Sequence, residues 1–343
     1  MAQDDEPAAV TQRTVALMAG VSTATVSRVL KGSGPASKPT RARVITAARE
    51  LGYSRPGRPR PAVVTAHEVY GLVLPDLAGA YDSELMMGFA SSAADLGQRV
   101  AVVVARRRHD ASAALHALAT RVDGLAIGAN TVPDRVVHDL AQRLPVVLLA
   151  RGEVHGCDSL RSENMGTAAA LTTHLLEHGR SHLVFVGDPD SSPDVAQRYS
   201  GFRTAHLVAG VPMRRPPLRV PLLEGAGIKV ADEILRRRVK VDGLVCANDD
   251  LALAIIRRLQ DHGMRLPDDL AVAGWDDVQA ARYIRPALTT VHQPIRDLGR
   301  FAALQLQGRL VGGRPAGSAR LLPTQLIIRS SCGCPVLSPI NEA

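Results

Sequence analysis

The feature that most constrains the fold of this chain is a regular alternation of short apolar runs with helix-like segments, which begins at Val69. Parallel strands require long crossover connections, which are usually helices, so this alternation is typical of a doubly wound parallel sheet. The apolar runs expected to form strands are 69–74, 100–105, 124–127 and 146–150, followed by 183–186, 218–222, 244–247 and 270–273. We therefore expect an α/β domain over residues 68–331.

The expected strands fall into two series, and each series is long enough to form a sheet of its own. Helical patterns occupy 83–96, a segment ending near 120, and then 167–178, 194–209, 227–238 and 251–262. Two doubly wound sheets imply two lobes. Ligands of such folds bind beyond the carboxyl ends of the strands, so a small-molecule cleft is expected between the lobes.

The first part of the chain is organised differently, because residues 11–53 have the pattern of three short helices. Thr11 and Ser22 are suitable N-caps for the first two helices, and Gly20 breaks the chain between them. Ser37 is a suitable cap for the third helix. The close spacing of the first two helices predicts a small all-α unit of the helix-turn-helix type.

The formal charge of +8 is concentrated near this helical unit. Residues 1–62 contain ten Lys or Arg and four Asp or Glu, and three of these acids lie in the acidic tail formed by residues 1–10. Such a basic, free-standing unit is the electrostatic footprint of a module that binds nucleic-acid phosphates. A helical hairpin packed on a larger core is the alternative, but it would explain neither the charge nor the linker that follows.

That linker is the segment 54–67, in which proline and arginine recur. The prolines prevent a regular helix, and the composition changes sharply after it. We interpret this segment as a connection between two separately folded domains.

The four cysteines are Cys157, Cys246, Cys332 and Cys334. They have neither paired C-x-x-C spacing nor a neighbouring histidine cluster, so reduced thiols are expected and neither a metal site nor a cofactor is. A redox or metal role for Cys332 and Cys334 is the alternative to our preferred interpretation, a C-terminal tail over 332–343. The N-terminus has no apolar signal segment and no stretch is long enough to cross a membrane, so we expect a cytoplasmic protein.

Short motifs typical of one known family occur in order along nearly the whole chain. In the helical unit they are Ala19-Gly-Val-Ser-Thr-Ala-Thr-Val-Ser-Arg-Val-Leu30, Thr40-Arg-Ala-Arg-Val44 and Ala47-Ala-Arg-Glu-Leu-Gly-Tyr53. In the α/β region they are 71–76, 122–125, 145–148, 178–182, 198–201, 247–250, 274–277, 286–294 and 326–330. Together these motifs resemble the LacI/GalR family of transcriptional regulators, the lactose-repressor type. The resemblance implies a helix-turn-helix headpiece joined to a bilobed, periplasmic-binding-protein-like sensor domain.

The resemblance also implies that the second headpiece helix contacts DNA. Thr23, Ala24 and Arg28 would read bases, since an arginine can bond a guanine through two hydrogen bonds and a small apolar group can meet a thymine methyl. Thr25 and Ser27 can reach phosphates. A phosphate clamp without sequence preference is the alternative role for Arg28.

The linker departs from the family pattern. In the family this span usually folds on DNA into a hinge helix that inserts a leucine into the minor groove, whereas here prolines and a glycine interrupt it. We expect instead an extended arm that follows phosphates or enters a narrow minor groove. The basic residues of this arm are Arg55, Arg58 and Arg60.

For the cleft, the resemblance implies effector contacts by Arg198, Asn248 and Asp276, which suit vicinal hydroxyls or a purine edge. Tyr81 lies where the family differs from this chain and could stack on a ring. Trp275 is either a platform for a sugar or, as we prefer, a core residue. The expected effector is a sugar or a nucleoside.

Two other classes of protein compete with this interpretation. A solute-binding transport component would share the bilobed fold, but it would need a signal peptide and no basic headpiece. A sugar-acting enzyme would need catalytic groups, and apart from the adjacent Asp249 and Asp250 we find no set of nucleophile, base and orienting residue.

The sequence thus predicts a regulator rather than an enzyme. We expect a homodimer that presents two headpieces to a roughly palindromic operator, with the effector changing its affinity for DNA allosterically. Repression is the favoured output. No heptad repeat follows Ser331, so a tetramerising coiled coil is not expected.

Overall fold

A computed structural model describes residues 11–31, 37–50, 67–77, 79–105, 110–129, 131–237, 241–312 and 316–334. The chain divides into two compact units, residues 1–65 and residues 66–343. Among the helices of these described segments, none is both long and apolar enough to cross a membrane. The units are taken separately below.

The first unit contains three helices, α1 (Gln12–Ala19), α2 (Thr23–Lys31) and α3 (Lys38–Glu50). Gly20 has a φ of 61° and ends α1 in the left-handed conformation that glycine adopts without strain. Ser22 accepts a hydrogen bond from the Thr25 amide at 3.2 Å, and Ser37 accepts one from the Thr40 amide at 3.3 Å. The predicted helices and their caps are therefore confirmed.

A small apolar core holds the three helices together. It contains buried side chains from each helix, namely Val15, Ala16, Ala19, Val26, Val29, Val44, Ala47 and Ala48. The small alanines allow the helices to approach closely. The face of α2 opposite Val26 and Val29 is in solvent.

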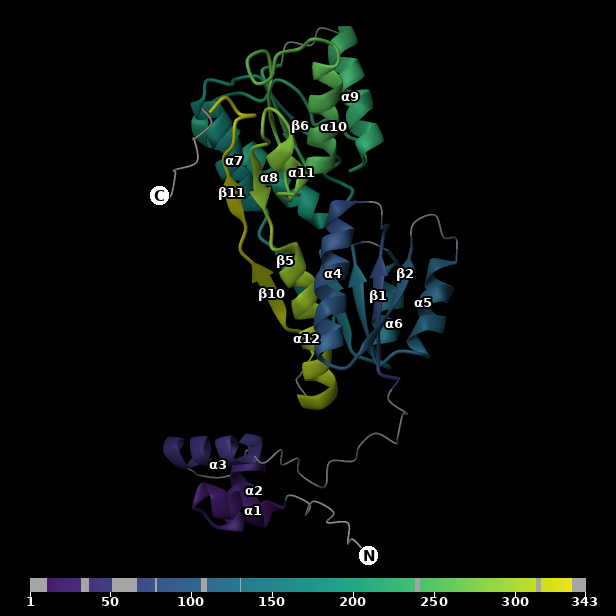
Figure 1. Cartoon of the computed structure of the whole chain (residues 1–343), viewed down its shortest axis with the longest axis vertical. Coiled ribbons are helices and arrows are strands. Elements are labelled where there is room, and N and C mark those ends of the chain that lie inside the picture. The colour runs from purple at the N-terminus through teal and green to yellow at the C-terminus, as the bar shows by residue number, and fades with distance from the viewer. Residues whose placement is uncertain are drawn as a thin grey trace, which may run out of the picture. The chain divides into compact units, whose positions relative to one another are not determined.

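The second unit has two lobes, each built on a parallel sheet (Figure 1). The first sheet has the strand order β10-β5-β4-β3-β1-β2, and its strands are β1 (Val69–Leu74), β2 (Arg99–Val104), β3 (Gly124–Gly128), β4 (Val146–Leu149), β5 (Asp158–Ser162) and β10 (Ala319–Leu322). Its helices are α4 (Ala80–Asp95), α5 (Ala111–Ala119), α6 (Asp134–Ala141) and α12 (Ile295–Gly312). These elements make up the first lobe.

Helices cover both faces of the first sheet because side chains of β1 alternate between them. Tyr70, Leu72 and Leu74 pack with residues of α4 and α12, whereas Val73 packs with residues of α5 and α6. Both faces are buried along the central strands β1, β3 and β4, whereas β2 and β10 have exposed residues.

The second sheet has the order β6-β7-β8, with strands β6 (Leu183–Val186), β7 (Gly243–Cys246) and β8 (Ala271–Ala273). The surrounding helices are α7 (Met165–Glu177), α8 (Pro193–Ala209), α9 (Glu224–Arg237), α10 (Asp249–Gln260) and α11 (Ala280–Tyr283). A separate antiparallel pair joins β9 (Thr290–His292) to β11 (Gln325–Ile327). The chain passes between the lobes after β5, after β9 and after β10 (Figure 1).

One predicted strand is wrong. Residues 218–222 form no strand, and only Leu218 makes an isolated bridge, to Val186 at the end of β6. Prolines precede and interrupt this segment, and proline cannot donate to a strand ladder. The end of this segment instead brings Leu222, and the next residue Leu223, to the cleft described below.

Candidate functional site

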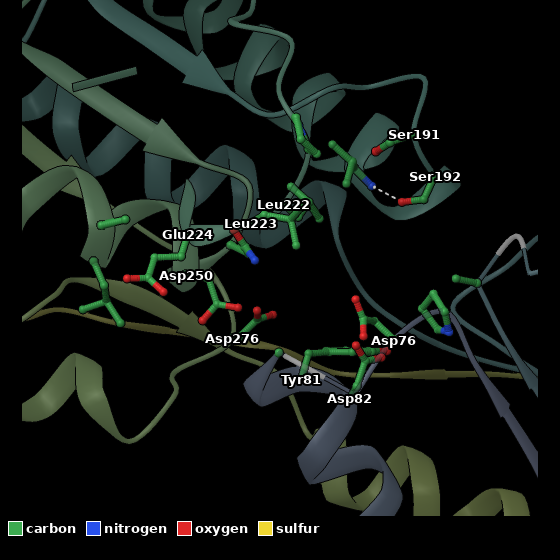
Figure 2. A pocket seen from close by; sticks show the side chains of 18 of the residues that line it. Asp76, Tyr81, Asp82, Ser191, Ser192, Leu222, Leu223, Glu224, Asp250 and Asp276 are labelled. Atoms are coloured by element: carbon green, nitrogen blue, oxygen red, sulfur yellow. Dashed lines mark hydrogen bonds between the residues drawn. The ribbon is translucent and has the colours of Figure 1, made fainter. Parts of the chain in front are cut away.

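A cleft of about 1580 Å³ is lined by residues of both lobes of the second unit. Its walls come from turns at the carboxyl ends of the strands, as doubly wound folds favour. From the first lobe, Asp76 follows β1, and Tyr81 and Asp82 lie in the first turn of α4. Figure 2 shows these side chains facing Asp250 and Asp276 of the second lobe across the cleft.

Arg198, a predicted contact residue, lines the cleft and is held in place by neighbouring groups. It lies on α8, whose first turn is fixed by Ser192, which accepts a hydrogen bond from the Val195 amide at 3.3 Å (Figure 2). Its Nε donates to Asn164 Oδ1 at 2.8 Å, and its Nη1 donates to the Ala247 carbonyl at 2.6 Å. A buried guanidinium fixed in this way is preorganised to donate further hydrogen bonds.

Trp275 requires a correction as a predicted contact residue, because it does not line the cleft. Its side chain is 1% exposed and belongs to the core of the second lobe. The guanidinium carbon of Arg198 lies 4.6 Å from the centre of its ring. Trp275 therefore supports Arg198 from behind by a cation–π contact, in agreement with the preferred core interpretation.

Asn248 and Asp276 both line the cleft. Asn248 caps α10, since its Oδ1 accepts a hydrogen bond from the Leu251 amide at 3.2 Å. Asp276 follows β8 with a φ of 121°, a conformation that costs free energy for a residue other than glycine. Gln293, which lies where the chain crosses between the lobes, donates a hydrogen bond to Asp276 Oδ1.

Asp276 is only 7% exposed. Burial raises its pKa to about 7, although Arg198 and the Gln293 hydrogen bond favour the ionised form. A carboxyl with such a pKa changes charge near neutral pH, and it can accept hydrogen bonds from ligand hydroxyls when it is ionised.

The adjacent Asp249 and Asp250 have different roles. Asp249 is fully buried and accepts hydrogen bonds from Thr290 Oγ1 at 2.6 Å and from the Val278 amide at 3.0 Å. Asp250 instead lines the cleft, where burial and the nearby Glu224 raise its pKa. The two carboxylates thus do not act as a pair.

Tyr81 lies on the first-lobe wall of the cleft, as predicted (Figure 2). Burial raises the pKa of its hydroxyl, and the negative charges of Asp194 and Asp276 raise it further. The phenol is therefore neutral at physiological pH, so it offers a ring and one hydrogen-bond donor.

Acidic side chains dominate the cleft, and most of them were not predicted as site residues. They are Asp76, Asp82, Asp194, Glu224, Asp250, Asp261 and Asp276. The basic side chains of the lining are Arg198, Arg257 and Arg258, and the last two pair with Asp261 and Asp232. All of these carboxylates except Asp261, which ends α10, follow a strand or lie in the first turn of a helix, a position from which the sequence could have predicted them.

The first unit presents its predicted contact residues on α2. Thr23, Ala24 and Arg28 are exposed, and Thr25 and Ser27 are half-buried. The Thr25 hydroxyl shares a hydrogen bond of 2.9 Å with Ser22. The remaining predicted contacts, Arg55, Arg58 and Arg60, lie outside the described residues.

Comparisons with known proteins agree with both units. Residues 11–56 match the family model of bacterial regulatory proteins of the lacI family, and residues 172–332 match a periplasmic binding protein-like domain. The transcriptional regulator GalS of Salmonella typhimurium is 32% identical over 311 residues, which cover 87% of this chain and 90% of GalS. The chain belongs to the LacI family.

Other relatives of this LacI-family chain are repressors or regulators. The transcriptional repressor CytR of Escherichia coli is 27% identical over 328 residues, 94% of this chain and 96% of CytR. The solved structure of a lac repressor dimer bound to operator and an anti-inducer has a TM-score of 0.69 at 26% identity, covering 94% of this chain and 99% of that one. A complex of the regulator CelR with cellobiose has the same TM-score at 28% identity, covering 94% and 100%.

The predicted family and fold are therefore confirmed. The chain is a LacI-family transcriptional regulator with a helix-turn-helix DNA-binding domain and a periplasmic-binding-protein-like domain. The family consists of regulators rather than enzymes, so the predicted absence of catalysis also holds.

Proposed function

We propose that this LacI-family protein represses transcription from the cytoplasm as a homodimer that binds a palindromic operator, and that a small molecule in the cleft changes its affinity for that operator. The observation that carries DNA recognition is the exposed face of α2, where Thr23, Ala24 and Arg28 lie opposite the buried Val26 and Val29. A helix packed by one face and polar on the other is suited to the major groove.

Selection from a pool of randomised duplexes at near-physiological salt tests this proposal. The expected result is enrichment of two inverted half-sites, because a symmetric dimer presents the same helix twice. Retention of duplexes without any sequence preference would contradict the proposal, since phosphate contacts alone carry no sequence information.

The cleft favours a neutral, hydroxyl-rich effector such as a sugar or a nucleoside. Its acidic lining would repel a phosphorylated or carboxylated ligand, whereas carboxylates accept hydrogen bonds from hydroxyls readily. Apolar contacts are available from Tyr81, Leu222 and Leu223 for a ring face. The relative CelR, whose solved complex contains cellobiose, is consistent with this class of ligand.

Thermal denaturation with a panel of neutral sugars, nucleosides and their phosphate esters tests the effector class. A ligand that binds the folded state raises the melting temperature by mass action. We expect stabilisation by one or more neutral compounds and none by the matching phosphate ester. Stabilisation by phosphate esters alone would contradict this assignment.

Effector binding would act through the segments that join the lobes. Asp276 reaches the cleft and bonds to Gln293, which lies at one of the crossings between the lobes. A ligand that engages Asp276 therefore acts on the orientation of the lobes. By linkage, it shifts operator affinity only as far as it binds the two conformations differently.

The arginines of the linker are expected to add affinity without specificity. Replacing Arg55, Arg58 and Arg60 together with Ala should make the dependence of log K on log salt shallower by about 2.7 per headpiece, since each lost phosphate contact removes about 0.9. Operator affinity is measured over a series of salt concentrations. An unchanged slope and affinity would show that the arm does not contact DNA, and Lys replacements at the same positions serve as the control because they keep the charge.

A further inference from the structure

Two histidines and two cysteines form a cluster in the second lobe, away from the cleft. His174 and His178 lie one turn apart on and just after α7, so their side chains share one face. Cys332 and Cys334 follow β11, which packs beside α7 (Figure 1). The fold thus joins parts of the chain that are more than 150 residues apart.

Three short contacts between ring nitrogens and thiol sulfurs connect the four side chains. His174 Nε2 lies 3.3 Å from Cys332 Sγ and 3.7 Å from Cys334 Sγ. His178 Nε2 lies 3.0 Å from Cys334 Sγ. The ligand atoms of His174, Cys332 and Cys334 all fall within 4.8 Å of one another.

These three nitrogen–sulfur separations are close to the nitrogen–sulfur edges of a zinc tetrahedron. Zinc binds thiolate sulfur at about 2.3 Å and imidazole nitrogen at about 2.0 Å, which places neighbouring nitrogen and sulfur ligands about 3.5 Å apart in a tetrahedron. A cation of this size therefore fits among His174, Cys332 and Cys334, and His178, which contacts Cys334, can complete a set of four ligands by a side-chain adjustment.

The orientation of His178 supports the same conclusion. Its Nδ1 lies 2.8 Å from the His174 carbonyl oxygen, an arrangement in which Nδ1–H donates and the lone pair stays on Nε2. Metal-binding histidines usually donate their other ring N–H to a carbonyl or carboxylate in this way. The lone pair of His178 consequently points at the cysteine side of the cluster.

The cluster extends from the core of the second lobe to its surface. Cys332 is fully buried and receives a hydrogen bond from Thr289 Oγ1 at 3.2 Å, so the chain is part of the core at this position. His178 is exposed, which leaves the cluster a route to solvent. The sequence interpretation found no histidines near these cysteines because they are distant in the chain and only the fold brings them together.

We propose that His174, His178, Cys332 and Cys334 bind one zinc ion, which fastens the segment after β11 to α7. Two sulfur and two nitrogen ligands in a tetrahedron are the chemistry of a structural zinc site. On binding, both thiols release a proton to solvent, so two thiolate charges balance the dication. The site has no open position and supports the fold rather than a reaction.

The test uses the full-length protein purified under reducing conditions. We expect one zinc ion per chain by elemental analysis after zinc is added and excess is removed. After replacement by cobalt, the protein should show the visible bands of tetrahedral cobalt and a thiolate-to-cobalt charge-transfer band. Chelation should lower the melting temperature.

Two variants and a matched control assign the site. His178→Gln alters an exposed side chain, and Cys334→Ser alters a half-buried one, so at least the first should fold normally. Each should lose the bound zinc and the cobalt spectrum. His262→Gln is the control, because His262 is also exposed at a helix end, with its Nδ1 2.9 Å from the carbonyl oxygen four residues earlier.

Several results would overturn the proposal. One is a reduced wild-type protein that binds neither zinc nor cobalt, and another is a Cys332–Cys334 disulfide that persists while zinc is present. Binding of zinc that survives in both variants, or that His262→Gln abolishes equally, would place the ion elsewhere. Loss of the metal in both variants with retention in the control is the result we expect.

Discussion

Replacing Arg28 with Ala is expected to weaken binding to the selected operator by roughly 5- to 150-fold per half-site while leaving nonspecific DNA binding nearly unchanged. A bidentate arginine–guanine contact discriminates against the wrong base by about 1–3 kcal/mol. Arg28 is exposed on α2, one turn after Ala24, whose carbonyl oxygen its Nε contacts at 3.4 Å. The side chain can leave this weak contact at little cost and extend into the groove.

The control distinguishes base reading from phosphate contact. Arg41→Ala removes an exposed arginine from α3 of the same unit, so it should weaken specific and nonspecific binding alike. Titration of operator and scrambled duplexes at one salt concentration gives both affinities. If Arg28→Ala lowered both in equal proportion, Arg28 would be a phosphate clamp and the proposed base contact would be wrong.

Replacing Asp276 with Asn is expected to reduce effector affinity by roughly 10- to 150-fold. Hydrogen bonds to a charged group contribute about 1.5–3 kcal/mol, and the amide cannot supply that charge. The variant keeps an oxygen that can accept the Gln293 hydrogen bond, so the crossing between the lobes should stay intact. Calorimetric titration with a neutral ligand from the panel measures the change.

The pH dependence of the same affinity provides an independent check. Burial raises the pKa of Asp276 to about 7, so wild-type affinity for a hydroxylated ligand should rise as the carboxyl ionises above that pH. The Asn variant should lose this rise. The matched control is Asp269→Asn, an exposed acid of the same lobe outside the cleft, which should keep wild-type affinity and pH dependence.

The melting temperature of Asp276→Asn distinguishes the loss of a ligand contact from unfolding of the variant. The pKa of Asp276 is about 7 in the folded protein and 3.8 in the unfolded chain. Between these pH values Asp276 is protonated only in the folded protein, so its contribution to the free energy of unfolding falls as the pH rises through this range. Asn removes this cost, so Asp276→Asn should melt no lower than wild type at neutral pH. A lower melting temperature with proportional loss of effector binding would contradict a direct contact.

The sequence predicted the parallel strands well where burial is continuous. In β1, β3, β4, β6 and β7 both faces are covered by helices, so apolar residues run without interruption and the pattern is unambiguous. β5 and β10 escaped prediction because they are polar and lie at one side of the sheet, where β10 is the edge strand. Their pairing joins segments 160 residues apart, which no local pattern encodes.

The cleft was only partly predictable. Motif matching identified Arg198, Asn248 and Asp276, and all three line it. The sequence pattern could not show which of the adjacent Asp249 and Asp250 faces the core. Asp249 does so because it bonds to Thr290 and Val278, which lie in a distant strand and a distant loop. The cluster of His174 and Cys332 was missed for the same reason.

The measurement that tests the account most directly is the operator affinity of the full-length protein with and without a saturating ligand that stabilises wild type but not Asp276→Asn. Coupling between two sites typically amounts to about 1–3 kcal/mol. The account predicts that the two dissociation constants differ by roughly 5- to 150-fold. Equal dissociation constants at saturation would contradict it, because the cleft would then bind its ligand without controlling the DNA-binding unit.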